Sequence, residues 1–514
     1  MSSIKKGAIL SYLSLFVTIL IALLYTPILI RLLGQSEYGL YALIGSIASY
    51  FSIMDLGLGN AIVRYTARNR VVGDKAAESN LNALFLIMYS ILGILTLIIG
   101  FIFLNKLNSL FDSSLTLIEL KKAKVMLIIL IINFALSFPL GIFGSIMQAY
   151  EKFMAIKLLT IGRTILTPMV TVPLIYIGYG TVAMVVITTI INLLFLLFSM
   201  YYSFKYLKVS FYFGKLDSKI VKEILGYSFF VFLGVIVDQV YWNSDQFILG
   251  IVAGTIPVAV YAIAMQFIRI YMQFSTSISG LFLPKVTMMV AKKASNNELT
   301  EIMIKYGRLQ FIIMAYILSG FILFGQPFIN IWAGNDYRDA YYIVLLVMVP
   351  LSIPLIQNVG LSILYAKNLQ GFRSIILIFI AILNVVISIP LAKEFGGIGA
   401  ACATAISLII GNIISMNIYY QRKIGINIKA FWKNIYLITI PVLITLIIGV
   451  GINYLIKENN LWFFMFKIIL FTFAYINFMW LFGFNKYEKR LILSFVNLAR
   501  NAFYKSDFKK KFYK

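Results

Sequence analysis

The sequence contains no histidine and only one cysteine, and each shortage excludes a class of chemistry. Without histidine there is no imidazole for acid–base catalysis or for metal binding. Cys402 lies inside an apolar run and has no partner for a disulfide within the chain, so we expect it to serve as a small packing residue. The glycine-rich phosphate-binding loop of ATPases is also missing, and we find no cluster of metal-ligand residues. These shortages argue against ATP hydrolysis and metal catalysis.

The hydrophobic residues are what the chain has in excess. They make up 61% of its 514 residues, and the mean hydropathy is +0.93. Apolar runs of about 20 residues, the length that spans a bilayer as a helix, recur along the whole sequence. The first run follows two lysines but continues to Ile30 without a cleavage pattern, so it is predicted to be a retained helix. The sequence therefore predicts an all-α polytopic membrane protein.

Fourteen spans are predicted, and the charge between them gives their orientation. They begin near residues 8, 39, 80, 124, 157, 181, 224, 258, 306, 340, 374, 398, 432 and 461. The segments on the side of both termini hold 33 Lys and Arg, whereas the opposite loops hold 8. Because basic loops stay in the cytoplasm, both termini are predicted to be cytoplasmic. The net charge of +25 is thus explained by topology, and no nucleic-acid partner is expected.

An internal repeat relates spans one to six to spans seven to twelve. Three sets of residues recur at displacements of 215 to 220, among them Gly34 and Gly254, Pro139 and Pro354, and Gly180 and Gly399. Six spans return the chain to its starting side, so the two copies are parallel repeats, an arrangement typical of transporters that alternate access to a site between halves. The predicted domains are an N-terminal lobe (1–212), a C-terminal lobe (213–424), two accessory helices (425–485) and a basic cytoplasmic tail (486–514).

Two spans carry polar faces that point to a cavity. In span two, Tyr50 and Asn60 lie on a face that ends near Arg64; a polar seam for helix packing is the alternative. In span eight, Gln266, Arg269 and Gln273 share a face that continues to Gly280. A charge deep in a membrane is costly, so Arg269 is predicted to contact an anion in a cavity, or else to form a structural ion pair.

The intramembrane aspartates have two interpretations each. Asp238 and Asp245 in span seven either carry a proton or Na⁺, or pair with Arg269. Asp55 lies in a DLGLGN segment whose glycines allow a kink; its carboxylate either takes part in ion coupling or, as we favour, holds that region in place. Arg163 lies beside a stripe of threonines and either adds to a cationic lumen or extends toward the cytoplasmic surface. Arg64 is either a contact at the inner mouth or a topological anchor.

The stretch from residue 32 to 67 resembles the start of the polysaccharide-transporter family. These are Wzx-type flippases of the multidrug/oligosaccharidyl-lipid/polysaccharide exporter superfamily. The matching residues are Gly34, Tyr38, Gly39, Tyr41, Asp55, Leu56, Gly57, Leu58, Arg64 and Tyr65. The span count and the two appended helices also fit, so the resemblance covers essentially the whole chain.

The resemblance implies a V-shaped pair of lobes that flips undecaprenyl-diphosphate-linked oligosaccharide, such as an O-antigen or capsule repeat unit, across the bacterial plasma membrane. It implies that Arg269 holds the diphosphate or an acidic sugar, with Arg64 and Arg163 at the inner mouth. The implied partners are membrane lipid and the polymerase and chain-length machinery, with H⁺ or Na⁺ as coupling ion and no cofactor. Two alternatives stay open: a drug or cation antiporter of the same superfamily, and a membrane enzyme such as a polymerase or ligase.

Overall fold

The computed structural model describes residues 3–214, 218–279, 283–457 and 460–494, and these residues form helices without any strand. Gly280 and the tail from residue 495 lie outside the described residues. The α-helices of the first half are α1 (Ser3–Leu33), α2 (Gln35–Ser49), α3 (Leu58–Val72), α4 (Lys75–Phe111), α5 (Leu117–Ala149), α6 (Phe153–Tyr176), α7 (Thr181–Leu207) and α8 (Ser218–Val252).

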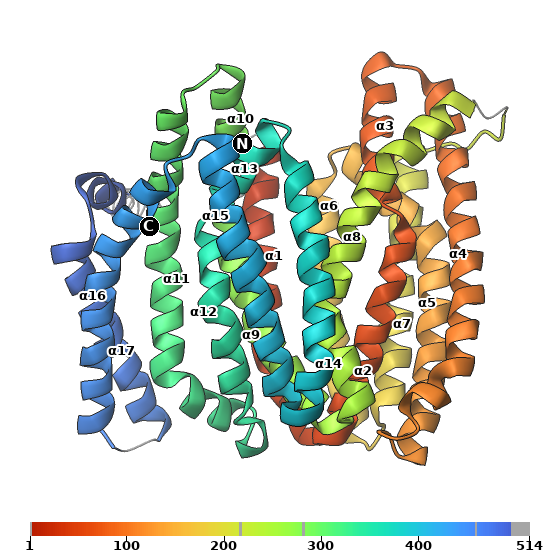
Figure 1. Cartoon of the computed structure of the whole chain (residues 1–514). Coiled ribbons are helices and arrows are strands. Elements are labelled where there is room, and N and C mark those ends of the chain that lie inside the picture. The colour runs from red at the N-terminus through yellow and green to blue at the C-terminus, as the bar shows by residue number, and fades with distance from the viewer. Residues whose placement is uncertain (1–2, 215–217, 280–282, 458–459, 495–514) are drawn as a thin grey trace, which may run out of the picture. The chain divides into compact units, whose positions relative to one another are not determined.

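The remaining α-helices follow in chain order (Figure 1). They are α9 (Thr255–Ser279), α10 (Leu283–Ala291), α11 (Asn296–Trp332), α12 (Ala340–Ile356), α13 (Asn358–Ala366), α14 (Gln370–Leu408), α15 (Met416–Tyr419), α16 (Ile428–Leu455) and α17 (Leu461–Phe478). Short 3₁₀ segments are η1 (Tyr50–Asp55) and η2 (Asn335–Tyr337), and π-helical segments are η3 (Ile409–Ser415), η4 (Tyr420–Ile424) and η5 (Met479–Gly483).

Thirteen helical stretches in the described residues are long and apolar enough to cross a membrane. They match the fourteen predicted spans, because the stretch Gly371–Ile424 contains the two spans expected from residues 374 and 398. Gly396 breaks the helix inside this stretch, with φ +56° and ψ −135°. The fold class predicted from the sequence, an all-α multi-pass membrane protein, is therefore confirmed.

Helix ends are fixed by short polar side chains that precede the apolar runs. Asp74 accepts a hydrogen bond from the Ala77 amide at the start of α4 (2.8 Å), and Asn427 accepts one from Ala430 at the start of α16 (2.9 Å). At α5, Thr116 and Glu119 exchange hydrogen bonds in a capping box. These contacts satisfy amide groups that have no partner within the helix, so each apolar run starts at a defined residue.

The second predicted span is not one continuous helix. It runs as α2, then the 3₁₀ turn η1, then α3, and two residues between η1 and α3 have positive φ: Leu56 (+51°) and Gly57 (+74°). The Asp55 carboxylate accepts a hydrogen bond from the Tyr89 hydroxyl (2.7 Å) and a long one from the Gly59 amide (3.5 Å). The DLGLGN segment is thus a break in the helix with its carboxylate tied to α4.

The chain divides into two compact units that are described separately. Unit 1 comprises Met1–Gln266, Trp332–Ile343 and Leu377–Ser407; unit 2 comprises Phe267–Ile331, Val344–Ile376 and Leu408–Lys514. In unit 1, α4, α5 and α7 lie side by side (Figure 1) around a core that includes Phe85, Ile142 and Ile146. In unit 2, α16 packs on α17 around Phe471 and Met479. The predicted division into lobes at residue 212 stays a prediction.

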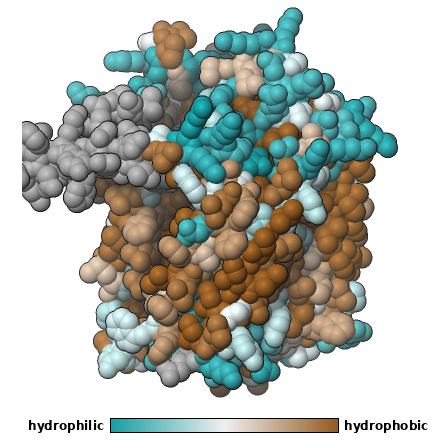
Figure 2. Space-filling view, turned by 90° about the vertical axis from the view of Figure 1, so that its left-hand side faces the viewer, coloured by the Kyte–Doolittle hydropathy of each residue, from teal (hydrophilic) through white to brown (hydrophobic). Residues whose placement is uncertain are grey.

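The outer face of the accessory helices is apolar. Figure 2 shows this side of the molecule, where brown apolar residues cover most of the middle and teal hydrophilic residues gather at the upper end. On α16 and α17, Trp462, Ile447 and Phe473 expose 84%, 72% and 68% of their surface. Apolar exposure of this extent suits contact with lipid chains, as expected for membrane-spanning helices.

Candidate functional site

Asp245 is a buried carboxylate in α8, and only 3% of its surface is exposed. Its Oδ2 accepts hydrogen bonds from the hydroxyls of Tyr261 in α9 and Thr404 in α14, both at 2.6 Å. Its Oδ1 accepts one from Ser388, also in α14, at 2.8 Å. All of these residues belong to unit 1. The carboxylate therefore has three neutral hydroxyl partners, gathered from residues that are far apart in sequence.

Asn384 extends this group, and we name Asp245, Tyr261, Asn384, Ser388 and Thr404 the Asp245 cluster. The Asn384 amide nitrogen lies 3.4 Å from the Thr404 hydroxyl, and its carbonyl oxygen lies 2.8 Å from the Ser388 hydroxyl. Asn384 and Ser388 are fully buried. Buried polar groups in a membrane protein are costly, and polar residues placed together in this way commonly mark ion pathways.

The Ser388 hydroxyl lies between two oxygens of the cluster. The Ser388 hydroxyl lies 2.8 Å from both Asp245 Oδ1 and Asn384 Oδ1, yet a hydroxyl carries a single hydrogen. A proton on Asp245, a small cation between the oxygens, or an Asn384 amide turned so that its nitrogen faces Ser388 each gives every contact a donor. Oxygen donors of this type suit H⁺ or a hard cation such as Na⁺. Among the described residues, no group of three or more His, Cys, Asp or Glu side chains could hold a metal ion.

Tyr50, predicted to lie on the polar face of span two, contacts the residue next to Asp245. Its hydroxyl lies 3.2 Å from the Ser244 hydroxyl, and its ring packs edge-on against Phe247 with centroids 6.3 Å apart. Asn60, predicted on the same face, is exposed at the start of α3. The structure thus places Tyr50 close to the Asp245 cluster, whereas Asn60 lies exposed at the start of α3.

The polar face predicted for span eight lies on α9. The Gln266 amide donates to the Ala22 carbonyl in α1 (3.1 Å) and accepts from the Thr26 hydroxyl (3.0 Å). Arg269 has an exposed side chain. Gln273 has a side-chain oxygen that is buried and makes no hydrogen bond among the described residues. Gln266 therefore joins α9 to α1 within unit 1.

The other predicted cations lie at different places in unit 1. The Arg64 guanidinium stacks over the Tyr227 ring, 4.7 Å from its centroid. Arg163 donates to the Asn192 side chain in α7 at 2.8 Å, and Asn192 in turn donates to Asn133 in α5 at 2.9 Å. Asp238, seven residues before Asp245 in α8, has an exposed side chain. The candidate residues thus do not form one cluster within this unit.

The sequence singled out Asp245 but not the residues that bind it. Asn384 and Ser388 are four residues apart in an apolar span, which places them on one helical face, and this spacing was the available signal. Tyr261 lies 220 residues after Tyr41, as Gly254 does after Gly34, but nothing in the sequence marks it as a ligand, and Thr404 is a lone hydroxyl between alanines. Single hydroxyls are uninformative in a sequence because they often bond to their own helix.

The sequence is similar to that of one protein family and of several known proteins. The profile of a protein family described as "Polysaccharide biosynthesis protein" matches residues 4–290, more than half of the chain. A probable low-salt glycan biosynthesis flippase of Haloferax volcanii is 24% identical over 264 residues, or 49% of this chain and 53% of the relative, so the chain spans about half the length of that protein. A putative O-antigen transporter of Shigella flexneri is 20% identical over 81% of this chain and 98% of its own.

Among solved structures, the chain resembles the lipid II flippase MurJ in an inward closed conformation. The TM-score is 0.72, with 18% identity over 93% of this chain and 98% of that one. At this identity the likeness establishes the fold alone. The internal two-fold repeat predicted from the sequence remains a prediction, although Gly34 and Gly254, which it pairs, share the same φ of +80°.

Proposed function

The chain belongs to the family of polysaccharide biosynthesis proteins, and from that premise we propose that it flips a polyprenyl-diphosphate-linked oligosaccharide from the inner to the outer leaflet of the plasma membrane. The observation that carries the proposal is the family match over residues 4–290. The names of the relatives from Haloferax volcanii and Shigella flexneri, a flippase and a transporter, support transport over catalysis. The expectation that the chain is a transporter and not an enzyme therefore stands.

The proposed contacts for the substrate head group are the cations and amides of the polar faces. Arg269 is proposed to bind the diphosphate, because a guanidinium donates two parallel hydrogen bonds to phosphate oxygens. Further contacts are assigned to Arg64, Arg163, Gln266, Gln273, Asn60 and Tyr50. Arg64 and Arg163 serve the inner mouth, at the side where both termini are predicted to lie. The polymerase and chain-length machinery are the proposed recipients of the flipped unit.

Ion coupling is proposed to take place at the Asp245 cluster. Its support is the buried Asp245 carboxylate, whose hydrogen-bond partners are the neutral hydroxyls of Tyr261, Ser388 and Thr404. One carried charge moving through 100 mV contributes about 2.3 kcal/mol, roughly a 50-fold change in the distribution of substrate between the leaflets. An H⁺ or Na⁺ gradient is thus sufficient to make flipping directional without ATP.

The test is a flipping assay in proteoliposomes with a fluorescent polyprenyl-diphosphate oligosaccharide. We expect wild type to flip the lipid, Arg269→Ala to lose both binding and flipping by at least about tenfold, and Arg269→Lys to lose less, since it keeps the charge without the bidentate geometry. A wild-type protein that neither binds nor flips such lipids but exports organic cations is an antiporter, and the proposal is then wrong.

A further inference from the structure

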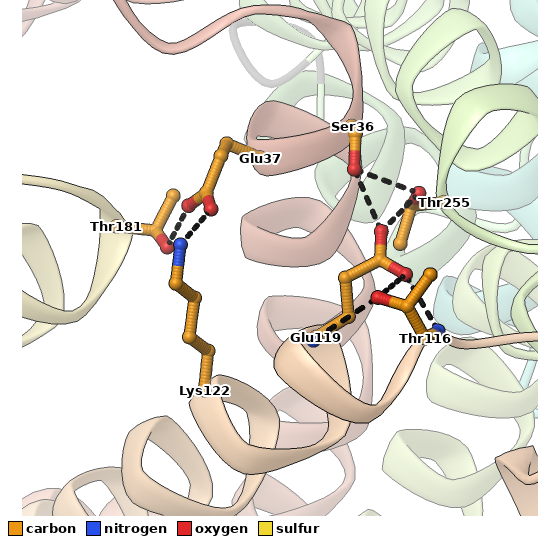
Figure 3. Close-up of polar contacts among 7 residues, drawn as sticks. All are labelled: Ser36, Glu37, Thr116, Glu119, Lys122, Thr181 and Thr255. Atoms are coloured by element: carbon orange, nitrogen blue, oxygen red, sulfur yellow. Dashed lines mark hydrogen bonds and ion pairs between the residues drawn. The ribbon is translucent and has the colours of Figure 1, made fainter.

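Two carboxylates lie where α2, α5, α7 and α9 all begin (Figure 3). Glu119 in the first turn of α5 divides its two oxygens between different partners. Oε2 accepts from the Thr116 amide and hydroxyl, both at 2.8 Å, and so caps its own helix. Oε1 accepts from the Ser36 hydroxyl in α2 at 2.6 Å and from the Thr255 hydroxyl in α9 at 2.9 Å. One carboxylate therefore joins the starts of three helices.

Glu37, the residue after Ser36, fastens α2 to two further helices. It forms an ion pair with Lys122 in α5, and its Oε2 accepts a hydrogen bond from the Thr181 hydroxyl at the start of α7 at 2.6 Å. The ends of α2, α5 and α7, all in the predicted N-terminal lobe, are thus held by an ion pair and several hydrogen bonds. Thr255 is the residue of the predicted C-terminal lobe that joins them.

Glycines allow the chain to approach this junction closely. A Cβ on Gly39 would lie 1.9 Å from the Thr255 carbonyl oxygen, so α2 and the start of α9 are in backbone contact. A Cβ on Gly254, whose φ is +80°, would lie 2.8 Å from the Ser114 carbonyl oxygen. The Ser114 hydroxyl also donates to the Gly250 carbonyl at the end of α8 (2.8 Å). At Gly39 and Gly254 the backbones therefore meet without an intervening side chain.

We propose that this junction is a latch that closes the predicted outer end between the two lobes and opens when the substrate leaves. We define the latch as Ser36, Glu119 and Thr255 together with the Gly39 backbone contact; all lie in unit 1. The inference rests on the proposed function, because a flippase must expose its substrate first to one side and then to the other.

The bonding pattern favours a junction that opens over a permanent one. If α9 moves away, Glu119 loses only the hydrogen bond from Thr255 and keeps those from Thr116 and Ser36. No charge is left without a partner, because the ion pair of Glu37 with Lys122 lies wholly on one side of the seam. Breaking the seam therefore avoids the large penalty of an unpaired buried charge.

Disulfide trapping tests the latch. In a Cys402→Ala background, we replace Ser36 and Thr255, whose hydroxyls lie 3.4 Å apart, with cysteine. Oxidation is expected to cross-link the double variant and to lower flipping at least about tenfold, and a reducing agent is expected to restore it. The single variants Ser36→Cys and Thr255→Cys are expected to be insensitive to the oxidant. Unchanged flipping in a fully cross-linked protein overturns the latch, whereas wild type that flips nothing points instead to a wrong substrate assignment.

A second measurement does not depend on the substrate. Labelling of Thr255→Cys with a membrane-impermeant maleimide added from outside reports whether the seam is open. Gly39→Ala is expected to raise the labelling rate at least about fivefold, because its methyl group must displace the Thr255 carbonyl. Gly45→Ala on the same helix is the matched control, since its Cβ has no atom within 4 Å, and it is expected to leave the rate unchanged. Equal rates in the two variants contradict the proposal.

Discussion

The hydroxyl of Tyr50 in η1 lies 3.2 Å from the hydroxyl of Ser244 in α8, and Ser244 directly precedes Asp245. This contact joins the broken second span to the helix that carries the buried carboxylate. A change at Asp245, whether a proton or a cation, therefore acts one residue away from a contact between the two predicted lobes. If Asp245 carries the coupling ion as proposed, this contact makes Tyr50 a positioning residue for coupling, in addition to its proposed contact with the substrate.

We predict that Asp245→Asn abolishes ion-coupled flipping. The amide has nearly the same shape; its oxygen still accepts from the Tyr261 and Thr404 hydroxyls and its nitrogen donates to the Ser388 hydroxyl, but it neither titrates nor balances a cation. Flipping measured with and without an imposed H⁺ or Na⁺ gradient is expected to become equal. Asp238→Asn is the control, because Asp238 lies in the same helix with an exposed side chain, and it is expected to retain the gradient response. A gradient response that survives in Asp245→Asn and is lost in Asp238→Asn reverses the assignment.

Tyr50→Phe is predicted to weaken coupling without harming the fold. It removes the hydrogen bond to Ser244 but keeps the edge-on ring contact with Phe247. Loss of such a bond costs about 0.5 to 1.5 kcal/mol. The ratio of flipping rates with and without the ion gradient is expected to fall severalfold, while ion binding measured by calorimetry stays unchanged. An unaltered ratio contradicts a role of Tyr50 in coupling.

Gly57→Ala is predicted to destabilise the break in the second span. Its φ of +74° is unfavourable for alanine, and the new Cβ would lie 2.7 Å from Val231 Cβ and 3.0 Å from the Ser228 carbonyl oxygen. The conformational cost alone is about 1 to 2 kcal/mol. The midpoint of thermal unfolding in detergent is expected to fall. Gly59→Ala is the matched control: its φ is not positive and its Cβ would meet atoms at 3.6 Å, so its unfolding midpoint is expected to stay unchanged or to rise slightly.

Arg308 and Glu488 form a buried pair in unit 2, and breaking it is predicted to be costly. The guanidinium binds the carboxylate at 2.7 Å and 2.9 Å and also donates to the Gly483 carbonyl at 2.9 Å, with side-chain exposures of 7% and 1%. Glu488→Gln leaves the buried charge unpaired, at a cost of about 3 to 5 kcal/mol. We expect earlier thermal unfolding and faster proteolysis after residue 483. The double variant Arg308→Met with Glu488→Met is expected to recover much of the loss.

The sequence was sufficient to predict the fold class because membrane spans can be recognised by their high hydropathy. The thirteen apolar stretches cover all fourteen predicted spans, and the continuous stretch Gly371–Ile424 is divided at Gly396. The break at Leu56 and Gly57 was partly predictable, since two glycines near Asp55 allowed a kink. That Leu56 shares the positive φ was not predictable, because non-glycine residues rarely adopt it.

The site was less predictable for a physical reason. Asp245 stood out because a charge in an apolar span is costly, but its partners are hydroxyls that cost little and leave no mark in the sequence. The same holds for Thr255 in the latch, where a hydroxyl at a helix start is ordinary until its partner is known. Arg308 and Glu488 lie 180 positions apart, so nothing in the sequence indicates that they pair.

That separation also has a consequence in time. Arg308 enters the membrane region with α11, but its carboxylate partner is synthesised 180 residues later. At about 5 to 20 residues per second, the ribosome needs on the order of 10 to 40 s to supply it. During this interval a guanidinium destined for burial has to remain hydrated or find a temporary partner, such as a lipid phosphate or a chaperone. Synthesis of Glu488, rather than insertion of α11, therefore sets the earliest moment at which this buried pair can form.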